Sequence, residues 1–221
     1  MNSHNVGSHF DDLSGKYDES KPKYYYERLT ALYASMIPAN KSILDAGCGT
    51  GEMLNSLKPS RGCGIDISAE MIKTARQKYP GLEFHAMPVE QLSGDAEYDY
   101  IIMVDVVEHV RDIGAMLEAL RRIASRNTII ICSWYNPLWE PVVRFMEFAG
   151  MKMPEGFHRL IFSGKFMDKA RDHGFVLVKK MNAFILPVPV LNLSDKINEI
   201  ADKVPFLQGL MFTQVVIFRL S

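Results

Sequence analysis

Residues 43–51, with the sequence ILDAGCGTG, restrict the fold of this chain more than any other stretch. A short apolar run ends at Asp45, and glycines follow at positions 47, 49 and 51. Glycine accepts a positive φ and lets a ligand approach the main chain, and a helix beginning near Glu52 would offer unpaired N–H groups. The stretch therefore predicts a strand, a tight loop and a helix that together hold a nucleotide-like ligand.

The spacing within this loop separates the candidate ligands. A dinucleotide-binding G-x-G-x-x-G would need its third glycine at Glu52, a poor neighbour for a pyrophosphate, and no Gly-Lys-Ser/Thr follows to make a P-loop. A second acid, Asp66, ends another short apolar stretch 21 residues after Asp45, where one strand–helix–strand unit would return it beside the loop. A carboxylate there could accept hydrogen bonds from both ribose hydroxyls of an adenosine.

The stretch LDAGCGTG resembles motif I of the class I S-adenosylmethionine (SAM)-dependent methyltransferases, and the resemblance extends over about residues 40–220. It implies SAM as the cofactor, with the methionine end at the loop and the ribose at Asp66. Many relatives have an Asp after the third strand for the adenine amino group, but this chain has Met87-Pro88-Val89. Adenine recognition would then rest on the Val89 main chain and on stacking by Met87. The cofactor residues that the resemblance implies are Asp45, Gly47, Cys48, Gly49, Gly51, Asp66, Ile67, Met71, Met87, Pro88, Val89, Val104 and Tyr17.

Apolar stretches and helical periodicities alternate from Ser42 onward. We expect strands near 42–46, 61–66, 82–87, 98–104 and 127–133, and helices near 52–58, 69–79 and 112–124, the last capped by Asp112. Ser163 is the expected N-cap of a further helix, which Gly174 ends. Strands over 175–186 and 212–220, with a helix near 195–203 between them, resemble the antiparallel hairpin that closes the class I methyltransferase sheet. The fold class predicted is α/β, a Rossmann-like doubly wound sheet of seven strands, mostly parallel.

The chain is expected to form one domain over residues 1–221, because its length and 48% hydrophobic content fit one full core. Residues 1–40 would form a helical cap, in which Tyr17 and one of Tyr24, Tyr25 and Tyr26 either fold over the cofactor or pack on the core. An insert at 136–158, interrupted by prolines, is either a substrate lid or an extra helix on the core. An open lid would expose Trp139, Phe145, Phe148 and Met151, so it would close over an apolar substrate or contact a membrane surface.

The fourth strand ends in MVDVVEHV, which would put Val104 and Asp105 beside the transferable methyl group. Asp105, Glu108 and His109 have D-x-x-E-H spacing, so on a helical turn they would project to one side. Carboxylates with one imidazole suit Mg²⁺ or Mn²⁺. The element resembles the E-x-x-E-H of ubiquinone-biosynthesis O-methyltransferases and small-RNA 2′-O-methyltransferases, with Asp in first place and His158 as the later ligand.

Three interpretations of this element remain open. Asp105, Glu108, His109 and His158 could hold a divalent metal; His109 or His158 could act as a general base without a metal, with Asp105 as a further catalytic candidate beside the methyl group; or the element could only start a helix.

The composition of the chain restricts which partners it can bind and in which compartment it is expected. A net charge of −1 without a Lys/Arg run disfavours long nucleic acid. The three cysteines, Cys48, Cys63 and Cys132, lack C-x-x-C spacing and are typical of buried fillers in a reducing compartment. Because the first residues lack the pattern of a signal peptide and no apolar run approaches 18 residues, we expect a cytoplasmic protein.

The resemblance implies a methyltransferase that acts on a small molecule, at a hydroxyl oxygen of an apolar or aromatic compound. Transfer to carbon or nitrogen is the alternative within the enzyme class. A non-catalytic SAM-binding protein and an NAD-dependent oxidoreductase are the alternatives outside it, and Glu52 disfavours the second.

Overall fold

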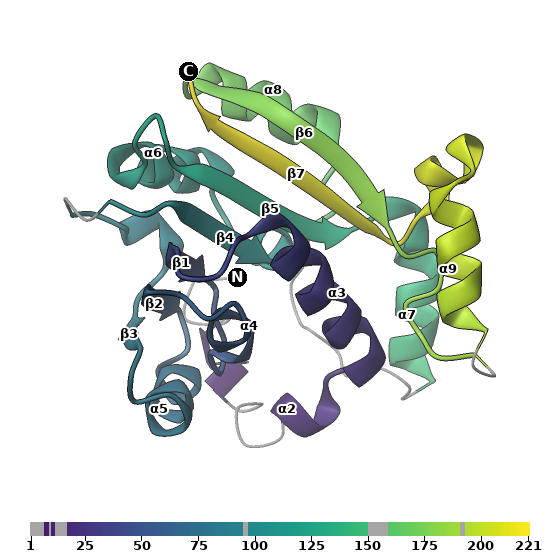
Figure 1. Cartoon of the computed structure of the whole chain (residues 1–221), viewed down its shortest axis with the longest axis horizontal. Helices are drawn as coiled ribbons and strands as arrows, with labels where there is room; N and C mark the ends of the chain where they lie inside the picture. Colours follow the sequence, from purple (N-terminus) through teal and green to yellow (C-terminus); the bar gives the residue numbers. More distant parts are fainter. Residues whose placement is uncertain (1–6, 9, 12–16, 95–96, 150–158, 191–192) are drawn as a thin grey trace.

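The computed structural model describes residues 7–8, 10–11, 17–94, 97–149, 159–190 and 193–221. A sheet of seven strands runs through it in the order β3-β2-β1-β4-β5-β7-β6 (Figure 1). β1 to β5 are mutually parallel, whereas β7 is antiparallel to both β5 and β6. The predicted mostly parallel sheet with an antiparallel C-terminal pair is therefore confirmed. The strands are β1 (Ser42–Ala46), β2 (Arg61–Asp66), β3 (Glu83–Ala86), β4 (Tyr100–Val104), β5 (Ile129–Tyr135), β6 (Phe175–Ala183) and β7 (Thr213–Leu220).

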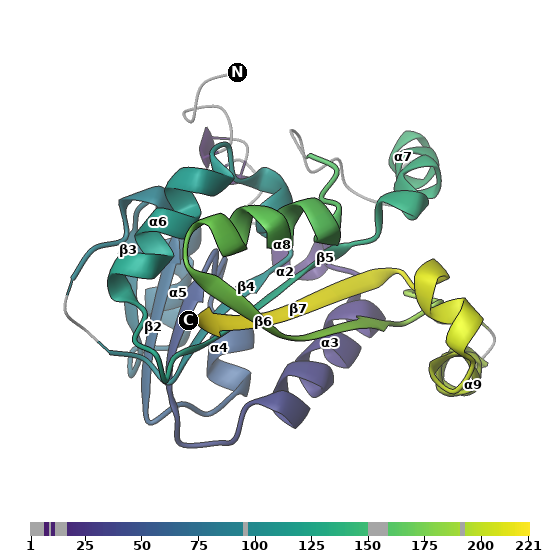
Figure 2. The ribbon, with the colours of Figure 1, turned by 90° about the horizontal axis from the view of Figure 1, so that it is seen from above.

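Helices cover both faces of this sheet (Figure 2). One core cluster contains buried residues of α3, α4 and α5, and the other contains those of α6 and α8. The α-helices are α2 (Tyr17–Ser20), α3 (Lys23–Met36), α4 (Glu52–Ser56), α5 (Ala69–Lys78), α6 (Ile113–Ile123), α7 (Glu140–Phe148), α8 (Ser163–Asp172) and α9 (Ser194–Asp202). The 3₁₀-helices are η1 (Val89–Gln91), η2 (Val107–His109), η3 (Pro137–Trp139) and η4 (Pro205–Leu210).

The apolar strands explain the two-sided burial. Ile43 and Leu44 are adjacent in β1 and both are buried, but they belong to opposite clusters because successive side chains of a strand point to opposite faces. Ile130 and Ile131 repeat this pattern in β5. Such strands require helices on both faces, which is why the alternating pattern predicts the layers correctly.

Of the two predicted N-caps, one is confirmed and the other is wrong. The Asp112 carboxylate accepts hydrogen bonds from the N–H groups of Gly114 and Ala115, so it caps α6 as predicted. Ser163 is not an N-cap: it is the first residue of α8, and Phe162, which cannot accept with its side chain, holds the cap position. The prediction for Ser163 is wrong because the helix begins at this residue, one position earlier than a cap at Ser163 would allow.

The insert and the connection between β6 and β7 lie at the same end of the sheet, where α7 and α9 are drawn in Figures 1 and 2. The Asn136 side chain donates to the carbonyls of Gly209 and Met211, and the Trp139 indole donates to the carbonyl of Leu210 at 2.8 Å. These bonds fasten the start of the insert to η4. Among the described residues, no helix combines the length and the apolar character that crossing a bilayer requires.

Candidate functional site

The loop after β1 carries the first group of predicted cofactor residues. Gly47, Gly49 and Gly51 have φ angles of 90°, 52° and 82°, in the left-handed region that favours glycine. A Cβ atom at Gly51 would lie 2.8 Å from the Phe84 ring, so the absence of a side chain there is a packing requirement. A Cβ atom at Gly49 would have as its nearest neighbour the Tyr17 ring, at 3.4 Å. Gly49 is therefore less restricted by packing than Gly51.

Asp66 links this loop to the end of β2. One carboxylate oxygen accepts from the Gly49 N–H and the other from the Ser68 N–H, each at 2.9 Å. Burial raises the pKa of Asp66, and the two backbone hydrogen bonds oppose that rise. The sequence prediction that a second acid returns beside the first loop is confirmed, and the acid holds the loop as well as facing the cavity described below.

Asp45, at the end of the apolar run in β1, is 1% exposed. Neither of its carboxylate oxygens has a hydrogen-bond partner among the described residues. Burial and the neighbouring charge of Asp66 raise its pKa to about 7, and the charge of Lys21 acts in the opposite direction. A buried carboxylate without a partner at a cavity wall fits a cationic ligand, because an incoming positive charge would stabilise its ionised form. The sulfonium and the amine of SAM are such charges.

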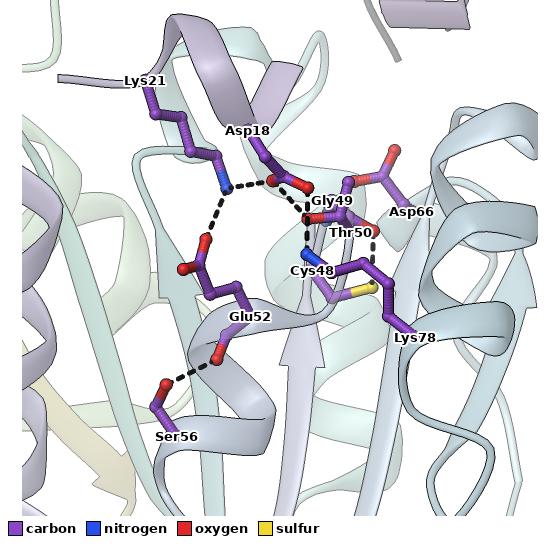
Figure 3. Close-up of polar contacts among 9 residues, drawn as sticks. All are labelled: Asp18, Lys21, Cys48, Gly49, Thr50, Glu52, Ser56, Asp66 and Lys78. Carbon is purple, nitrogen blue, oxygen red and sulfur yellow. Dashed lines mark hydrogen bonds and ion pairs between the residues drawn. The ribbon is translucent and has the colours of Figure 1, made fainter. Parts of the chain in front are cut away.

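Polar contacts fasten the N-terminal cap to the same loop (Figure 3). Asp18 in α2 accepts from the Thr50 hydroxyl at 2.7 Å and from Lys78 of α5 at 3.0 Å. Lys21 lies 3.5 Å from Asp18 and 3.7 Å from Glu52, the first residue of α4. Burial raises the pKa of Asp18, but the hydrogen bonds from Thr50 and Lys78 outweigh it, and the net shift is downward. Three separate segments therefore meet around one carboxylate.

A cavity of about 340 Å³ opens between the ends of β1, β2 and β4 and the cap. A second cavity adjoins it and shares four lining residues, Tyr17, Gly47, Gly49 and Val104. Asp45 and Cys48 line the second cavity. Gly51 lines neither of these two cavities. The predicted cofactor residues that line the first cavity are Tyr17, Gly47, Gly49, Asp66, Ile67, Met71, Met87, Pro88, Val89 and Val104.

The first cavity also has walls that the motif did not indicate. The Phe10 ring packs edge-on against Tyr17 at 6.4 Å and against His109 at 5.5 Å between centroids. Glu90 and Gln91 of η1 line the cavity after the third strand, where relatives often have an Asp. The aromatic at position 10 and the polar pair after Val89 were visible in the sequence, but only the fold brings them to this wall.

Asp105 stands between the cofactor cavity and a third cavity. It follows β4 with a φ of 53°, and its carboxylate accepts from the Tyr25 hydroxyl at 3.0 Å and from the Ser133 hydroxyl at 3.3 Å. Thr213 donates to the same Tyr25 hydroxyl at 3.2 Å. Burial and the charge of Asp105 raise the pKa of Tyr25 well above its ordinary value, so this phenol stays protonated and donates.

The third cavity, of about 160 Å³, is mainly apolar. Among the residues that the structure describes, Asp105 alone lines both it and the first cavity. Its walls come from α3, η3, α7, β5, the Phe212 region and residues 186–188. The last of these walls was not predicted from the sequence, although the run PVPV before the amphipathic helix α9 was a signal. The lining residues are Pro22, Tyr25, Tyr26, Asp105, Glu108, Tyr135, Trp139, Val142, Val143, Met146, Leu186, Pro187, Val188 and Phe212.

The expected metal set is not assembled by the residues that the structure describes. Asp105 lies outside the short 3₁₀-helix Val107–His109 and has a left-handed backbone, so the helical turn that would align it with Glu108 and His109 does not form. Glu108 lines the apolar cavity and His109 the cofactor cavity. Among described residues, the only acid, thiol and imidazole group whose donors gather within 4.8 Å lies elsewhere, at Cys63, Glu83 and His85. The prediction that the first three converge is wrong, Mg²⁺ is not supported, and His158 lies outside the described residues.

Comparison with known proteins bears on the chemistry of these cavities. A family model of methyltransferase domains matches residues 17–180. The putative methyltransferase 235L of Invertebrate iridescent virus 6 is 30% identical over 90 residues, which are 39% of this chain and 34% of that protein. The ubiquinone biosynthesis O-methyltransferase of Rhodopseudomonas palustris (strain HaA2) is 25% identical over 126 residues, 53% of this chain and 50% of that protein. The matches thus span half or less of the length of these curated relatives.

A solved structure of similar fold has a ligand bound. Magnesium protoporphyrin IX methyltransferase from Synechocystis PCC 6803, with bound SAH, matches with a TM-score of 0.70 and 18% identity over 99% of both chains. At this identity the likeness concerns the fold.

Proposed function

Because the chain belongs to the class I SAM-dependent methyltransferases, we propose that it transfers the SAM methyl group to a hydroxyl oxygen of an apolar or aromatic small molecule. The observation that supports this most directly is that Asp105 lines both the cofactor cavity and the apolar cavity. A group at that junction touches the acceptor and the transferable methyl at once. Asp45 and Asp66, with the loop between them, would hold the cofactor.

The reaction needs alignment and one proton acceptor. SAM supplies a methyl group bonded to its sulfonium sulfur. This sulfur leaves as a thioether when the acceptor oxygen attacks the methyl group in line. The apolar cavity orients the acceptor and excludes water, which favours the attack. The Asp105 carboxylate accepts the hydroxyl proton, and Tyr25 and Ser133 hold its two oxygens in place. His109, which lines the cofactor cavity, is the second candidate for the base; His158 remains a prediction.

A turnover assay tests this proposal. The protein is incubated with SAM and neutral aromatic alcohols, and products are examined by mass spectrometry for an added methyl group. Asp105→Asn should bind SAM as the wild type does and lower kcat about 100-fold or more, as removal of a general base does. Glu108→Gln, on the same cavity, is the matched control and should keep most of kcat.

Other outcomes lead to the alternatives. A loss in His109→Ala with normal turnover in Asp105→Asn would move the base to His109. SAM binding by calorimetry without product from any acceptor would indicate a non-catalytic SAM-binding protein, and tighter binding of NAD than of SAM would contradict the family assignment. Amines belong in the same panel, because Asp105 and Glu108 on an apolar wall also suit a cationic acceptor.

The proposed role of the insert at 136–158 is a lid over the acceptor, with a surface that contacts membranes. Leu138, Phe145 and Phe148 are 63%, 65% and 91% exposed. Exposed apolar residues of this size on two consecutive helices, Leu138 on η3 and the two phenylalanines on α7, favour a lipid surface that presents an apolar acceptor. Co-sedimentation with neutral phospholipid vesicles should fall in Phe145→Ser/Phe148→Ser, and equal sedimentation of variant and wild type would remove the membrane part of the proposal.

The three cysteines are free and buried, which supports the proposal of a reducing, cytoplasmic location.

A further inference from the structure

Three side chains of different chemistry meet on β2 and β3, at one edge of the sheet. β3 is the edge strand of the sheet, next to β2 (Figure 1). The two strands pair in parallel, with Cys63 opposite Glu83 and Ile65 opposite His85. Phe84 is buried in the cluster on one face, whereas Cys63 belongs to the cluster on the other. Because strand side chains alternate, Glu83 and His85 share the face of Cys63.

The donor atoms of this trio lie close together. The Cys63 sulfur, a Glu83 carboxylate oxygen and a His85 ring nitrogen are all within 4.8 Å of one another. Cys63 is 5% exposed, while Glu83 and His85 face solvent. Glu83 and His85 make no ion pair or side-chain hydrogen bond with any described residue, so a metal would not have to displace a protein partner from them. Small side-chain rotations would bring the three donors into one coordination sphere.

We propose that Cys63, Glu83 and His85 bind a zinc-type divalent cation, with water as the fourth ligand. Thiolate, imidazole and carboxylate are the donors that Zn²⁺ takes in tetrahedral sites. A single oxygen donor is too few for Mg²⁺ or Ca²⁺, which prefer oxygen shells. The ligands come from neighbouring strands with same-face spacing, so the rigid sheet positions them. One side of the site is closed by the core and the other is open to solvent.

The site is separate from the proposed methyl transfer. Cys63 lies three residues before Asp66 on β2, and Glu83 begins the strand that leads to Met87. His85 pairs with Ile65, which lines the cofactor cavity, so it is the member of the trio nearest to that cavity along the strands. None of its members lines that cavity. The cation would pin the edge strand β3 to β2 and would not contact the acceptor.

The thiol must lose a proton when the metal binds. Burial raises the pKa of Cys63, the Tyr98 hydroxyl and the charge of Arg61 lower it, and the charge of Glu83 raises it further. A bound divalent cation supplies the positive charge that stabilises the thiolate.

Metal titration of the tag-free full chain tests the site. Zinc alone is added to metal-stripped protein in competition with a chromophoric chelator, and Co²⁺ is used as a spectroscopic probe. We expect one ion per chain, a thiolate-to-cobalt charge-transfer band and a higher melting temperature with zinc. Cys63→Ser and His85→Gln should each lower the affinity about tenfold or more, since even outer-shell changes cost that much.

Matched variants keep the test decisive. Cys132→Ala and His173→Gln remove a thiol and an imidazole far from the trio and should bind as the wild type does. Glu83→Gln changes an exposed side chain, so it should fold normally and lose affinity. The proposal is overturned if the wild type binds no zinc, if the three site variants bind as well as the wild type, or if either control loses the ion.

Discussion

Asp45 is a carboxylate that the folded protein buries without a described hydrogen-bond partner, and this has a measurable effect on stability. Its pKa of about 7 lies above the ordinary value of 3.8, so the folded state binds more protons than the unfolded state between these values. The free energy of unfolding should therefore fall as pH rises from about 4 to about 7, by up to about 4 kcal/mol.

Asp45→Asn should remove this dependence. The ligand-free variant should be more stable than the wild type at pH 8 and equal to it near pH 4, as urea denaturation at several pH values would measure. The same variant should bind SAM more weakly at pH 8, because the cationic ligand loses its counter-charge. The prediction is contradicted if the free energy of unfolding of the wild type rises between pH 4 and 7 in parallel with that of the variant. Asp45 would then be ionised when buried.

Gly49 and Gly51 separate ligand binding from folding. Both have positive φ, which costs about 1–2 kcal/mol for alanine. At Gly51 the overlap with Phe84 adds about 1–3 kcal/mol, whereas at Gly49 the nearest neighbour is Tyr17 at 3.4 Å. Gly51→Ala should lower the melting temperature clearly more than Gly49→Ala, and Gly49→Val should weaken SAM binding in a folded protein. Equal melting temperatures for the two alanine variants would contradict the packing argument.

At the scale of single residues, the sequence predicted which residues belong to the site better than it predicted their backbone conformation. The glycine loop and Asp66 were identified because their spacing has one structural meaning. Asp105 was identified as well, but its i, i+3 and i+4 relation to Glu108 and His109 assumed a helical turn. Its left-handed backbone and its bonds to Tyr25 and Ser133 depend on segments 80 and 28 residues away, which local spacing does not encode.

At the scale of elements, the structure divides the insert between an inner and an outer surface. Trp139 lines the apolar cavity, packs edge-on against Phe212 at 5.5 Å and donates to Leu210. Phe148, on the same insert, is 91% exposed. Trp139→Ala should therefore raise KM for the acceptor severalfold and leave KM for SAM nearly unchanged, while Phe148→Ala should change neither.

Steady-state kinetics with both substrates varied, together with melting temperatures, would measure this. A similar rise of both KM values in Trp139→Ala, or a large loss of stability alone, would favour the interpretation of the insert as part of the core. The sequence left these two interpretations open because helical spacing of apolar residues is the same for a lid and for a core helix.

Strands and helices were predicted to within a few residues because their apolar patterns reflect burial on two faces. The acceptor cavity could not be predicted in the same way. Its walls come from α3, β5, the insert and the segment before α9, and which of their faces meet depends on the sheet order β5-β7-β6. The extent of residues 1–221 as one domain and the cofactor role of each lining residue remain predictions.

At the scale of the whole molecule, the N-terminal cap is fastened on two sides by different acids. Asp18 connects α2 to Thr50 and to Lys78, beside the cofactor cavities (Figure 3). Asp195 of α9 accepts from Tyr24 at 2.6 Å and lies 3.6 Å from Arg28, which connects α3 to the far end of the sheet. If the cap closes the cofactor site, breaking either connection should affect the binding of SAM differently.

Asp18→Asn should increase the dissociation rate of SAM and weaken its affinity roughly fivefold, equivalent to about 1 kcal/mol for a partly exposed network. Asp195→Asn should leave both unchanged. Stopped-flow release measures the rate, and hydrogen exchange over residues 17–36 should show lower protection in Asp18→Asn.

The Asp18 pKa is lowered, so the contribution of its carboxylate to stability is present at neutral pH and is lost as pH falls below 3.8, where wild type and variant should converge. High salt should reduce the difference because these ion pairs reach solvent. Equal release rates in both variants would mean that the cap is held by its apolar contacts alone, through Tyr25, Leu29 and Tyr33 in the core.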